Sequence, residues 1–214
     1  MRIYTFSVLE GYEWILPTDP TEFETFFALD GRRQIGWSPP HMEMIRESDA
    51  NQPNKRSDFP WLGSHAPILR RSVADALRPA LEAHGELLPL RCAEPVCLYN
   101  VTSVVNALDT SRSQLACFDN GDIMAIERHA FSAEIIGKRS IFKLPMRSSS
   151  VYVTAEFVSL VGSIGAQGVA FEMVWSDETV AADQNFVAFH AASSPSRGRS
   201  RLLPAIRSVL SKFR

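Results

Sequence analysis

The chain has 214 residues, 45% of them hydrophobic, so it is long enough to bury a core. The sequence contains no run of eighteen apolar residues, the length that a membrane-spanning helix needs. Its 22 Lys and Arg nearly balance its 24 Asp and Glu, which excludes an overall basic protein that binds nucleic acid by charge. The three cysteines are an odd number, and they argue against a disulfide framework.

The first third of the sequence predicts a strand, a short helix and a long connection. Residues 2–8 alternate polar and apolar side chains with the period of two that is typical of a strand with one apolar face. Asp19 and Pro20 suit the start of a helix, phenylalanines follow at helical spacing, and Gly31 supplies a stop. Residues 36–63 are rich in Pro, Asn, Ser and charge, which predicts a long irregular connection that could carry function.

A second helix is predicted to begin at the capping-box-like sequence that starts at Ser72, and to be kinked or divided at Pro79 before it ends at Gly85. Two short strands should follow. They are expected at residues 86–90 and 96–99.

The segment 97–109, CLYNVTSVVNALD, contains a glycosylation sequon at Asn100. We expect a strand to end here and a helix to begin, with Asn100 or Thr102 as its N-cap. The N-terminal sequence MRIYTFSVLEGYEW is too polar for a signal peptide, so a cytosolic location and an unmodified sequon are expected.

The strongest local signal is Asn120-Gly121, because these residues favour the positive φ angles of a type I′ hairpin turn between strands at 115–118 and 122–126. Thr154 is expected to cap a short helix. Further strands are expected at residues 140–144, 151–153 and 169–175.

Short strands mixed with short helices, and no strand-helix-strand regularity, predict an α+β fold with a mostly antiparallel sheet and short helices packed on it. Residues 1–192 are expected to form this domain, with a net charge of −8 from 16 Lys and Arg against 24 Asp and Glu. Residues 193–214 carry six cations and no acid, and predict a linker and a C-terminal amphipathic helix. We expect this helix to dock on the acidic body or on a second copy in preference to lipid.

No catalytic, metal or cofactor site is predicted. Cys92 and Cys97 have four residues between them, not the two of redox or zinc pairs, and Cys117 has no partner cysteine nearby. Glu127 and His129 would share one strand face, where such a pair could ligate a metal, but the other histidines show no spacing that completes a site. Nucleophile and phosphate-loop motifs are absent from the sequence.

Seven segments occur in an order that resembles a known family. They are GWSPP (36–40), SDFPWL (57–62), HGELLPL (84–90), YNVTSVVNALD (99–109), IFKLP (141–145), VYVTAEFVSLV (151–161) and GVAFEMVWS (168–176). Over roughly residues 1–176 the chain resembles the bacterial polymorphic-toxin immunity proteins of the eleventh immunity family, formerly a domain of unknown function. The resemblance implies a cytosolic, non-enzymatic protein that binds and neutralises a cognate toxin domain.

An acidic body would attract a basic toxin, and a basic nuclease is one candidate. Direct binding of nucleic acid and stable membrane association are not expected, and a homo-oligomer is an option. The alternative function is a hydrolase that reverses toxin damage with Glu127 and His129. Acidic positions outside the apolar segments are the expected toxin contacts: Glu43, Glu47, Asp49, Asp58, Asp177, Glu178 and Asp183.

Overall fold

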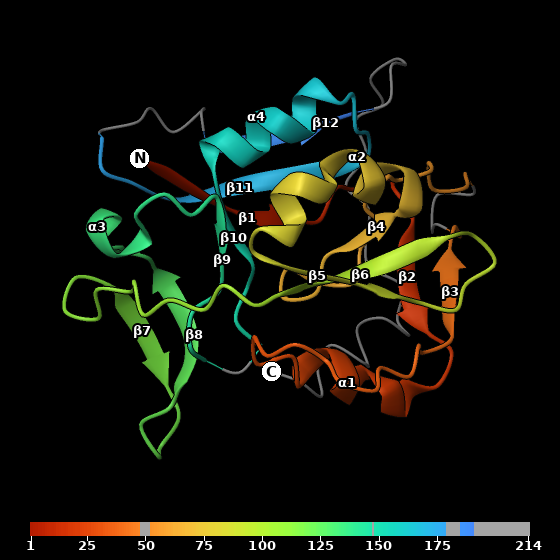
Figure 1. Cartoon of the computed structure of the whole chain (residues 1–214). Helices are drawn as coiled ribbons and strands as arrows, with labels where there is room; N and C mark the ends of the chain where they lie inside the picture. The colour runs from red at the N-terminus through yellow and green to blue at the C-terminus, as the bar shows by residue number, and fades with distance from the viewer. Residues whose placement is uncertain (48–51, 147, 179–184, 191–214) are drawn as a thin grey trace.

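The computed structural model describes residues 1–47, 52–146, 148–178 and 185–190. Short strands and short helices alternate along this part of the chain (Figure 1). The strands are β1 (Arg2–Ser7), β2 (Trp14–Pro17), β3 (Met42–Ile45), β4 (Ile68–Arg70), β5 (Gly85–Pro89), β6 (Val96–Val101), β7 (Gln114–Cys117), β8 (Ile123–Arg128), β9 (Ile141–Phe142), β10 (Tyr152–Thr154), β11 (Val169–Ser176) and β12 (Phe186–Phe189). The helices are α1 (Phe23–Phe27), α2 (Arg71–Glu82), α3 (Ala133–Ile136) and α4 (Ala155–Ser163), with a 3-10 turn at Pro20–Glu22.

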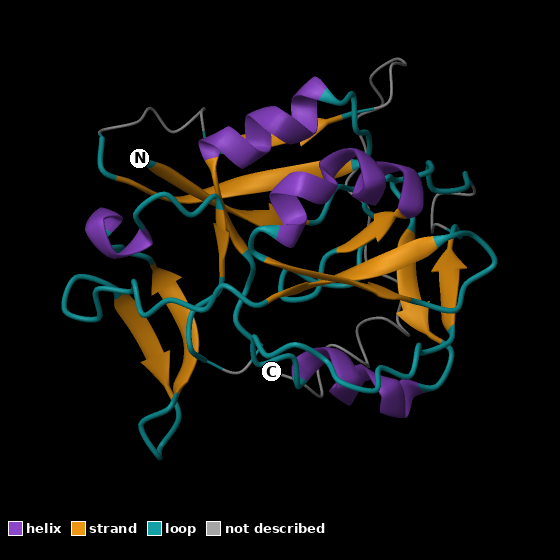
Figure 2. Cartoon of the chain, viewed as in Figure 1, coloured by secondary structure: helices purple, strands orange, loops and turns teal. Residues whose placement is uncertain are grey.

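The strands form one large sheet and three small ones, drawn in orange in Figure 2. The large sheet has the order β12-β11-β1-β10-β9. The first strand of the chain is therefore the central strand of this sheet, and it lies between β10 and β11, which come from the C-terminal part of the chain. β4, β6 and β5 form a three-stranded sheet, and β2 with β3 and β7 with β8 form pairs. Each pairing between two of these strands is antiparallel, which confirms the predicted α+β class.

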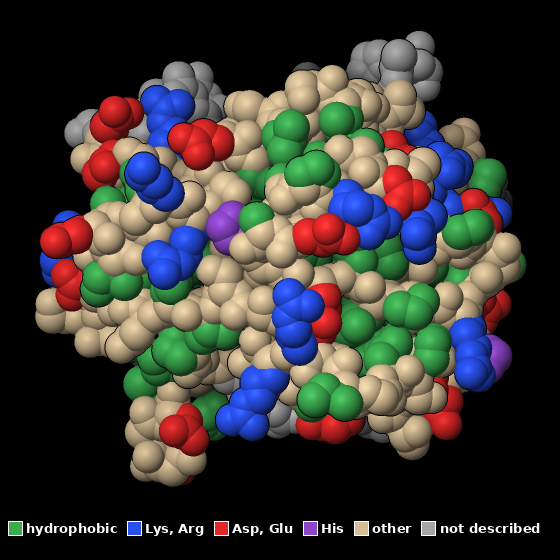
Figure 3. Space-filling view, in the orientation of Figure 1, with side chains coloured by type: hydrophobic (Ala, Val, Ile, Leu, Met, Phe, Trp, Pro, Cys, Tyr) green, Lys and Arg blue, Asp and Glu red, His purple; other side chains and the backbone are tan. Residues whose placement is uncertain are grey.

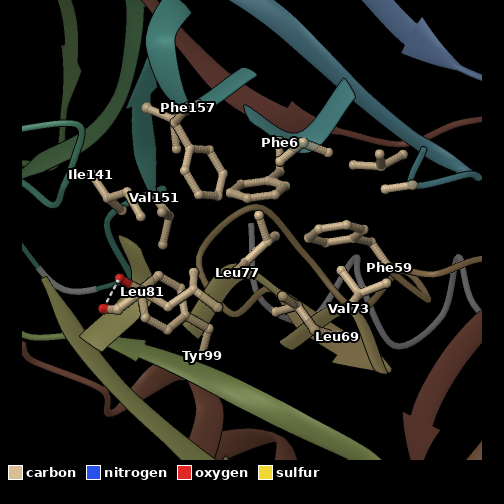
Figure 4. Packing of buried hydrophobic residues seen from close by; sticks show 14 of the residues in the cluster. Phe6, Phe59, Leu69, Val73, Leu77, Leu81, Tyr99, Ile141, Val151 and Phe157 are labelled. Atoms are coloured by element: carbon tan, nitrogen blue, oxygen red, sulfur yellow. Dashed lines mark hydrogen bonds between the residues drawn. The ribbon is translucent and has the colours of Figure 1, made fainter. Parts of the chain in front are cut away.

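The main hydrophobic core lies between the large sheet and the three-stranded sheet, and α2 and α4 bury their apolar faces in it. Phe6 of β1 and Phe157 of α4 point toward Leu77 of α2 (Figure 4). Tyr99 is buried there as well, and its hydroxyl donates to the Leu81 carbonyl at 2.9 Å. Burial raises the pKa of Tyr99, so the phenol stays neutral. Each large apolar side chain contributes roughly 1.5–3 kcal/mol when fully buried.

Two smaller cores flank the main one. Phe23 and Phe26 of α1 pack against β2, β3 and the three-stranded sheet, as their helical spacing predicts. On the other side, Phe142 stacks on Tyr152 with ring centroids 5.4 Å apart, and Phe131 meets Phe142 edge to face. The described part of the chain is therefore built on three adjoining apolar clusters.

The helix predicted from the segment 97–109 is wrong. Strand β6 continues through Asn100, and the following residues are extended beside β9, because Val105 N–H donates to the Lys143 carbonyl at 2.9 Å and Lys143 N–H donates to the Ser103 carbonyl at 2.9 Å. β-branched residues suit this extended pairing, and the backbone partner lies far away in sequence. The Asn100 side chain is buried and donates to the Arg32 carbonyl and the Glu86 carboxylate.

The hairpin predicted around Asn120-Gly121 is confirmed as β7 and β8, but its turn type is different. Gly121 has φ 87°, whereas Asn120 has a negative φ. Phe118 and Asp122 close the loop with a 2.8 Å backbone bond, and Gly121 N–H donates to the Phe118 carbonyl. This is a three-residue loop in which a type I turn precedes one left-handed glycine. The Asn120 side chain bonds Asp122, which favours its local turn.

Helix starts were predicted less well than helices. Asp19 accepts a hydrogen bond from Thr21 N–H at 2.8 Å, as its capping position predicts. The capping box at Ser72 is wrong, because α2 begins at Arg71 and its N-cap is Arg70, two residues before Ser72. The helix runs through Pro79 undivided. Thr154 precedes α4, but its side chain makes no capping bond. The predicted amphipathic helix in residues 193–214 lies outside the described residues.

Candidate functional site

Glu127 and His129 have separate partners in the structure. Glu127 is exposed near the end of β8, and its Oε2 accepts a hydrogen bond of 2.7 Å from Gln114. His129 lies after the strand, where its Nε2 is 3.0 Å from the Tyr152 hydroxyl and its ring stacks on Phe131. Burial lowers the pKa of His129 to about 4, so the ring is neutral at pH 7 and serves packing. This geometry does not join the two side chains in one site.

The cysteines lie in three different environments. Cys97 is buried in β6, and burial raises the pKa of its thiol to about 11, which makes it a poor nucleophile. Cys92 is half-buried and Cys117 is exposed. Within the described residues, no group of three or more His, Cys, Asp and Glu side chains is arranged to hold a metal ion.

The predicted contact acids lie at two ends of the molecule. Glu43 and Glu47 are exposed in and just after β3, whereas Asp177 and Glu178 follow β11 at the opposite end (Figure 1). Asp177 and Glu178 each pair with a residue at the start of the chain. The structure thus divides these acids into two separate surfaces. Two further predicted contacts, Asp49 and Asp183, lie outside the described residues.

Asp58 has a role in the fold, because its carboxylate is only 16% exposed. Its Oδ2 accepts a hydrogen bond from Gln167 N–H at 2.9 Å, and its Oδ1 lies 3.4 Å from the guanidinium of Arg56. Its backbone carbonyl also accepts from Arg70 N–H at 3.0 Å. Asp58 therefore joins the long connection to β4 and to the turn before β11.

A groove of about 400 Å³ runs beside Glu43, between β3 and the turn that joins β5 to β6. The two walls are held together because Met42 N–H donates to the Arg91 carbonyl at 2.7 Å and Arg91 N–H donates to the Pro40 carbonyl at 3.0 Å. Methionine side chains adapt to irregular apolar surfaces, and a charged rim surrounds them here. The lining residues are Thr18, Met42, Glu43, Met44, Arg46, Cys92, Ala93 and Glu94.

Two lining residues, Arg46 and Glu94, are the outer members of a buried ion network. Its centre is Arg70, whose guanidinium donates to the carboxylates of Glu13 and Glu94 and, through Nε, to the Ser57 carbonyl at 2.7 Å. Glu13 also accepts from Arg46 Nε at 2.9 Å and from Ser57 N–H at 3.0 Å. Arg46 donates to Glu94 as well, so each carboxylate accepts hydrogen bonds from two arginines. The network fixes the rim of the groove to the body of the protein.

The charges of Glu94 and Arg46 persist around neutral pH. Burial raises the pKa of Glu94, but the hydrogen bond from Arg46 and the charges of Arg70, Arg46 and Arg56 lower it further, so the pKa ends below its usual value. Hydrogen bonds to Glu13 and Glu94 raise the pKa of Arg46. Arg46 and Glu94 therefore keep their charges at the rim of the groove.

Glu13, Arg70 and Glu94 are not predicted as site residues by any sequence motif. A partial signal exists, because Glu13 interrupts the apolar run YEWIL and Arg70 follows the apolar run APIL. A charge inside an apolar run is buried only when it is paired. The partner of each charge is not visible in the sequence, since Glu13 and Arg70 are 57 residues apart.

Comparison with known proteins gives a match to a protein-family model. Residues 92–176 match the family model described as an immunity protein family (Imm11), and the match begins at the groove and spans β6 to β11. No curated protein matches the chain. Among the helices of the described ranges, none is long and apolar enough to cross a membrane. Over residues 92–176 the chain therefore carries the pattern of the Imm11 immunity protein family, which confirms the resemblance to an immunity family.

Proposed function

We propose that the protein is an immunity protein that binds a cognate bacterial toxin domain directly and neutralises it in the cytoplasm of the producing cell. The observation that carries this proposal is the family match over residues 92–176. The net charge of −8 in residues 1–192 would speed association with a basic toxin, for which a nuclease is one candidate. The proposed toxin-binding unit is residues 1–192, with residues 193–214 as an appendage.

The groove beside β3 is the proposed contact surface, with Glu43 and Glu47 as acidic contacts. Its concave shape and its mixture of methionine and charge suit an interface with an apolar centre and a polar rim. The Arg46 and Glu94 side chains are held by the ion network, so they lose little conformational freedom when a partner binds. Asp177 and Glu178 form the competing surface at the other end of the molecule.

The decisive experiment is co-expression with the product of an adjacent open reading frame that carries a toxin domain, followed by co-purification and a growth assay. A stoichiometric complex and restored growth are the expected results. If no complex forms and the toxin still stops growth, the proposal is wrong.

The hydrolase alternative is tested with the double variant Glu127→Ala/His129→Ala. Direct inhibition predicts that this variant still binds the toxin and still protects the cell, because these two side chains contact other residues of their own chain. Loss of protection with toxin binding intact would favour the enzyme.

A further inference from the structure

A second groove, of about 430 Å³, lies where the start of β1, the turn after α3 and the junction of β10 with α4 meet. The pairing of Ile3 with Thr154 brings β1 beside this junction. Thr154 N–H donates to the Ser140 carbonyl at 3.0 Å, which brings the turn after α3 to the same place. Figure 1 shows α3, the start of β1 and the start of α4 together, at the opposite end of the molecule from β3.

The lining of this groove is cationic although the body of the chain is acidic. Arg2, Lys138 and Arg139 line it, with Glu156 as the acid of the lining, and Arg2 is already paired with Glu178. Lys138 is exposed and makes no ion pair with a described residue. Arg139 uses its Nη1 atom to bond the last carbonyls of α3, which holds its guanidinium in place. Figure 3 shows Lys and Arg side chains around this region, with acidic side chains between them.

Thr154 adds a buried hydroxyl without a partner to this lining. The residue is 6% exposed, and its Oγ1 makes no hydrogen bond within the described part of the chain. A threonine at an N-cap ordinarily accepts a hydrogen bond from an amide in the first helical turn, but Thr154 makes no such bond. The first turn of α4 thus lacks a side-chain cap, and the Thr154 hydroxyl has no hydrogen-bond partner within the described residues.

We infer that this groove binds a phosphate-type oxyanion at the N-terminus of α4. A helix of nine residues offers unpaired N–H groups and a partial positive charge at this end, which together favour an anion. The Thr154 hydroxyl donates to an anion oxygen, and Lys138 and Arg139 neutralise its charge. The negative charge of Glu156 repels the anion, so Glu156 lowers the affinity of the groove for it. The site is separate from the proposed toxin-contact groove, and its test does not depend on the toxin.

The probe is inorganic phosphate, added to the purified full-length chain and followed by isothermal titration calorimetry and thermal unfolding. Saturable binding and a raised Tm are expected with phosphate, and not with sodium chloride at the same ionic strength. Lys138→Glu should weaken phosphate binding by about tenfold or more, whereas Glu156→Gln should strengthen it. The matched control Lys55→Glu reverses another exposed lysine and should leave the phosphate affinity unchanged.

Thr154→Val separates a ligand role from a structural one. If the hydroxyl serves the anion, the variant should be as stable as the wild type or more stable without phosphate, because a buried unpaired group is removed. Its stabilisation by phosphate should then be reduced. An effect of sodium chloride equal to that of phosphate, equal binding by Lys138→Glu and the wild type, or an undiminished phosphate effect in Thr154→Val would each overturn the inference.

Discussion

The guanidinium of Arg70 and the carboxylate of Glu13 form an ion pair that is almost entirely removed from solvent, with the two residues 2% and 1% exposed. The pair joins the entry to β2 with the start of α2, across 57 residues of sequence. Desolvation offsets much of the attraction in such a pair, so its presence alone says little about stability. Its removal is informative, because a single substitution leaves a buried charge behind.

Arg70→Met is expected to lower the free energy of unfolding by about 3–5 kcal/mol, since Glu13 and Glu94 lose a shared cation. Urea unfolding at pH 7 measures this change. Arg33→Met, which removes a 69% exposed guanidinium 4.0 Å from Glu86, should change stability by less than about 1 kcal/mol. Adding Glu13→Gln to Arg70→Met should recover part of the loss. Equal stability of Arg70→Met and Arg33→Met would contradict this account of the network.

The proposed contact surface is tested by reversing its two exposed acids. Glu43→Lys/Glu47→Lys is expected to weaken toxin binding by a few kcal/mol if the pairs are buried in the complex, mainly through faster dissociation. The matched variant Asp177→Lys/Glu178→Lys changes the same charge at the opposite end of the molecule and should bind normally. Surface plasmon resonance at two salt concentrations measures both. The reverse pattern would move the interface to the end of β11.

Local periodicity allowed much of the fold to be predicted. The strand at residues 2–8, the apolar stripe of α2 and the hairpin at Gly121 depend on side chains close in sequence, and each is present. The helix expected in the segment 97–109 failed because the backbone of Lys143, distant in sequence, pairs with it. Tertiary pairing thus overrode a helical spacing of valines.

The candidate site was predicted only in part. The sequence indicated Glu43 and Glu47 as acids outside the apolar segments, and both are exposed. It could not indicate the ion network, because Arg70 finds Glu13 and Glu94 through contacts of three separate segments. Side-chain chemistry is visible in a sequence, whereas convergence of distant side chains is a product of the fold.

The C-terminal segment remains a prediction from the sequence. A chain that ends at Ala192 is expected to lose thermal stability or to change its oligomeric state, because the apolar face of residues 193–214 would dock on the acidic body or on a second copy. Thermal unfolding and light scattering measure the two effects. If both stay unchanged while sedimentation with anionic vesicles is lost, the segment binds lipid instead.

Lys143 supplies a prediction about pH, because it is 2% exposed and its Nζ donates to the Leu29 carbonyl at 3.0 Å. Burial lowers the pKa of Lys143 to about 8, although the charge of Asp30 raises it somewhat. The unfolded chain holds this proton up to its ordinary pKa of about 10.4. Between these two values the unfolded state binds more protons than the folded state, so the contribution of Lys143 to stability rises with pH.

The wild type should therefore gain on the order of 2 kcal/mol relative to Lys143→Met as the pH rises from about 7.5 to about 9.5. Guanidinium chloride unfolding across this range measures the difference, and the comparison with the variant cancels the titration of all other groups. Lys143→Gln also removes the titration, and it should give the same slope as Lys143→Met even if its overall stability differs. A difference between wild type and both variants that stays constant with pH would mean that Lys143 keeps its ordinary pKa in the folded protein, and that the burial of its ammonium group carries no electrostatic penalty.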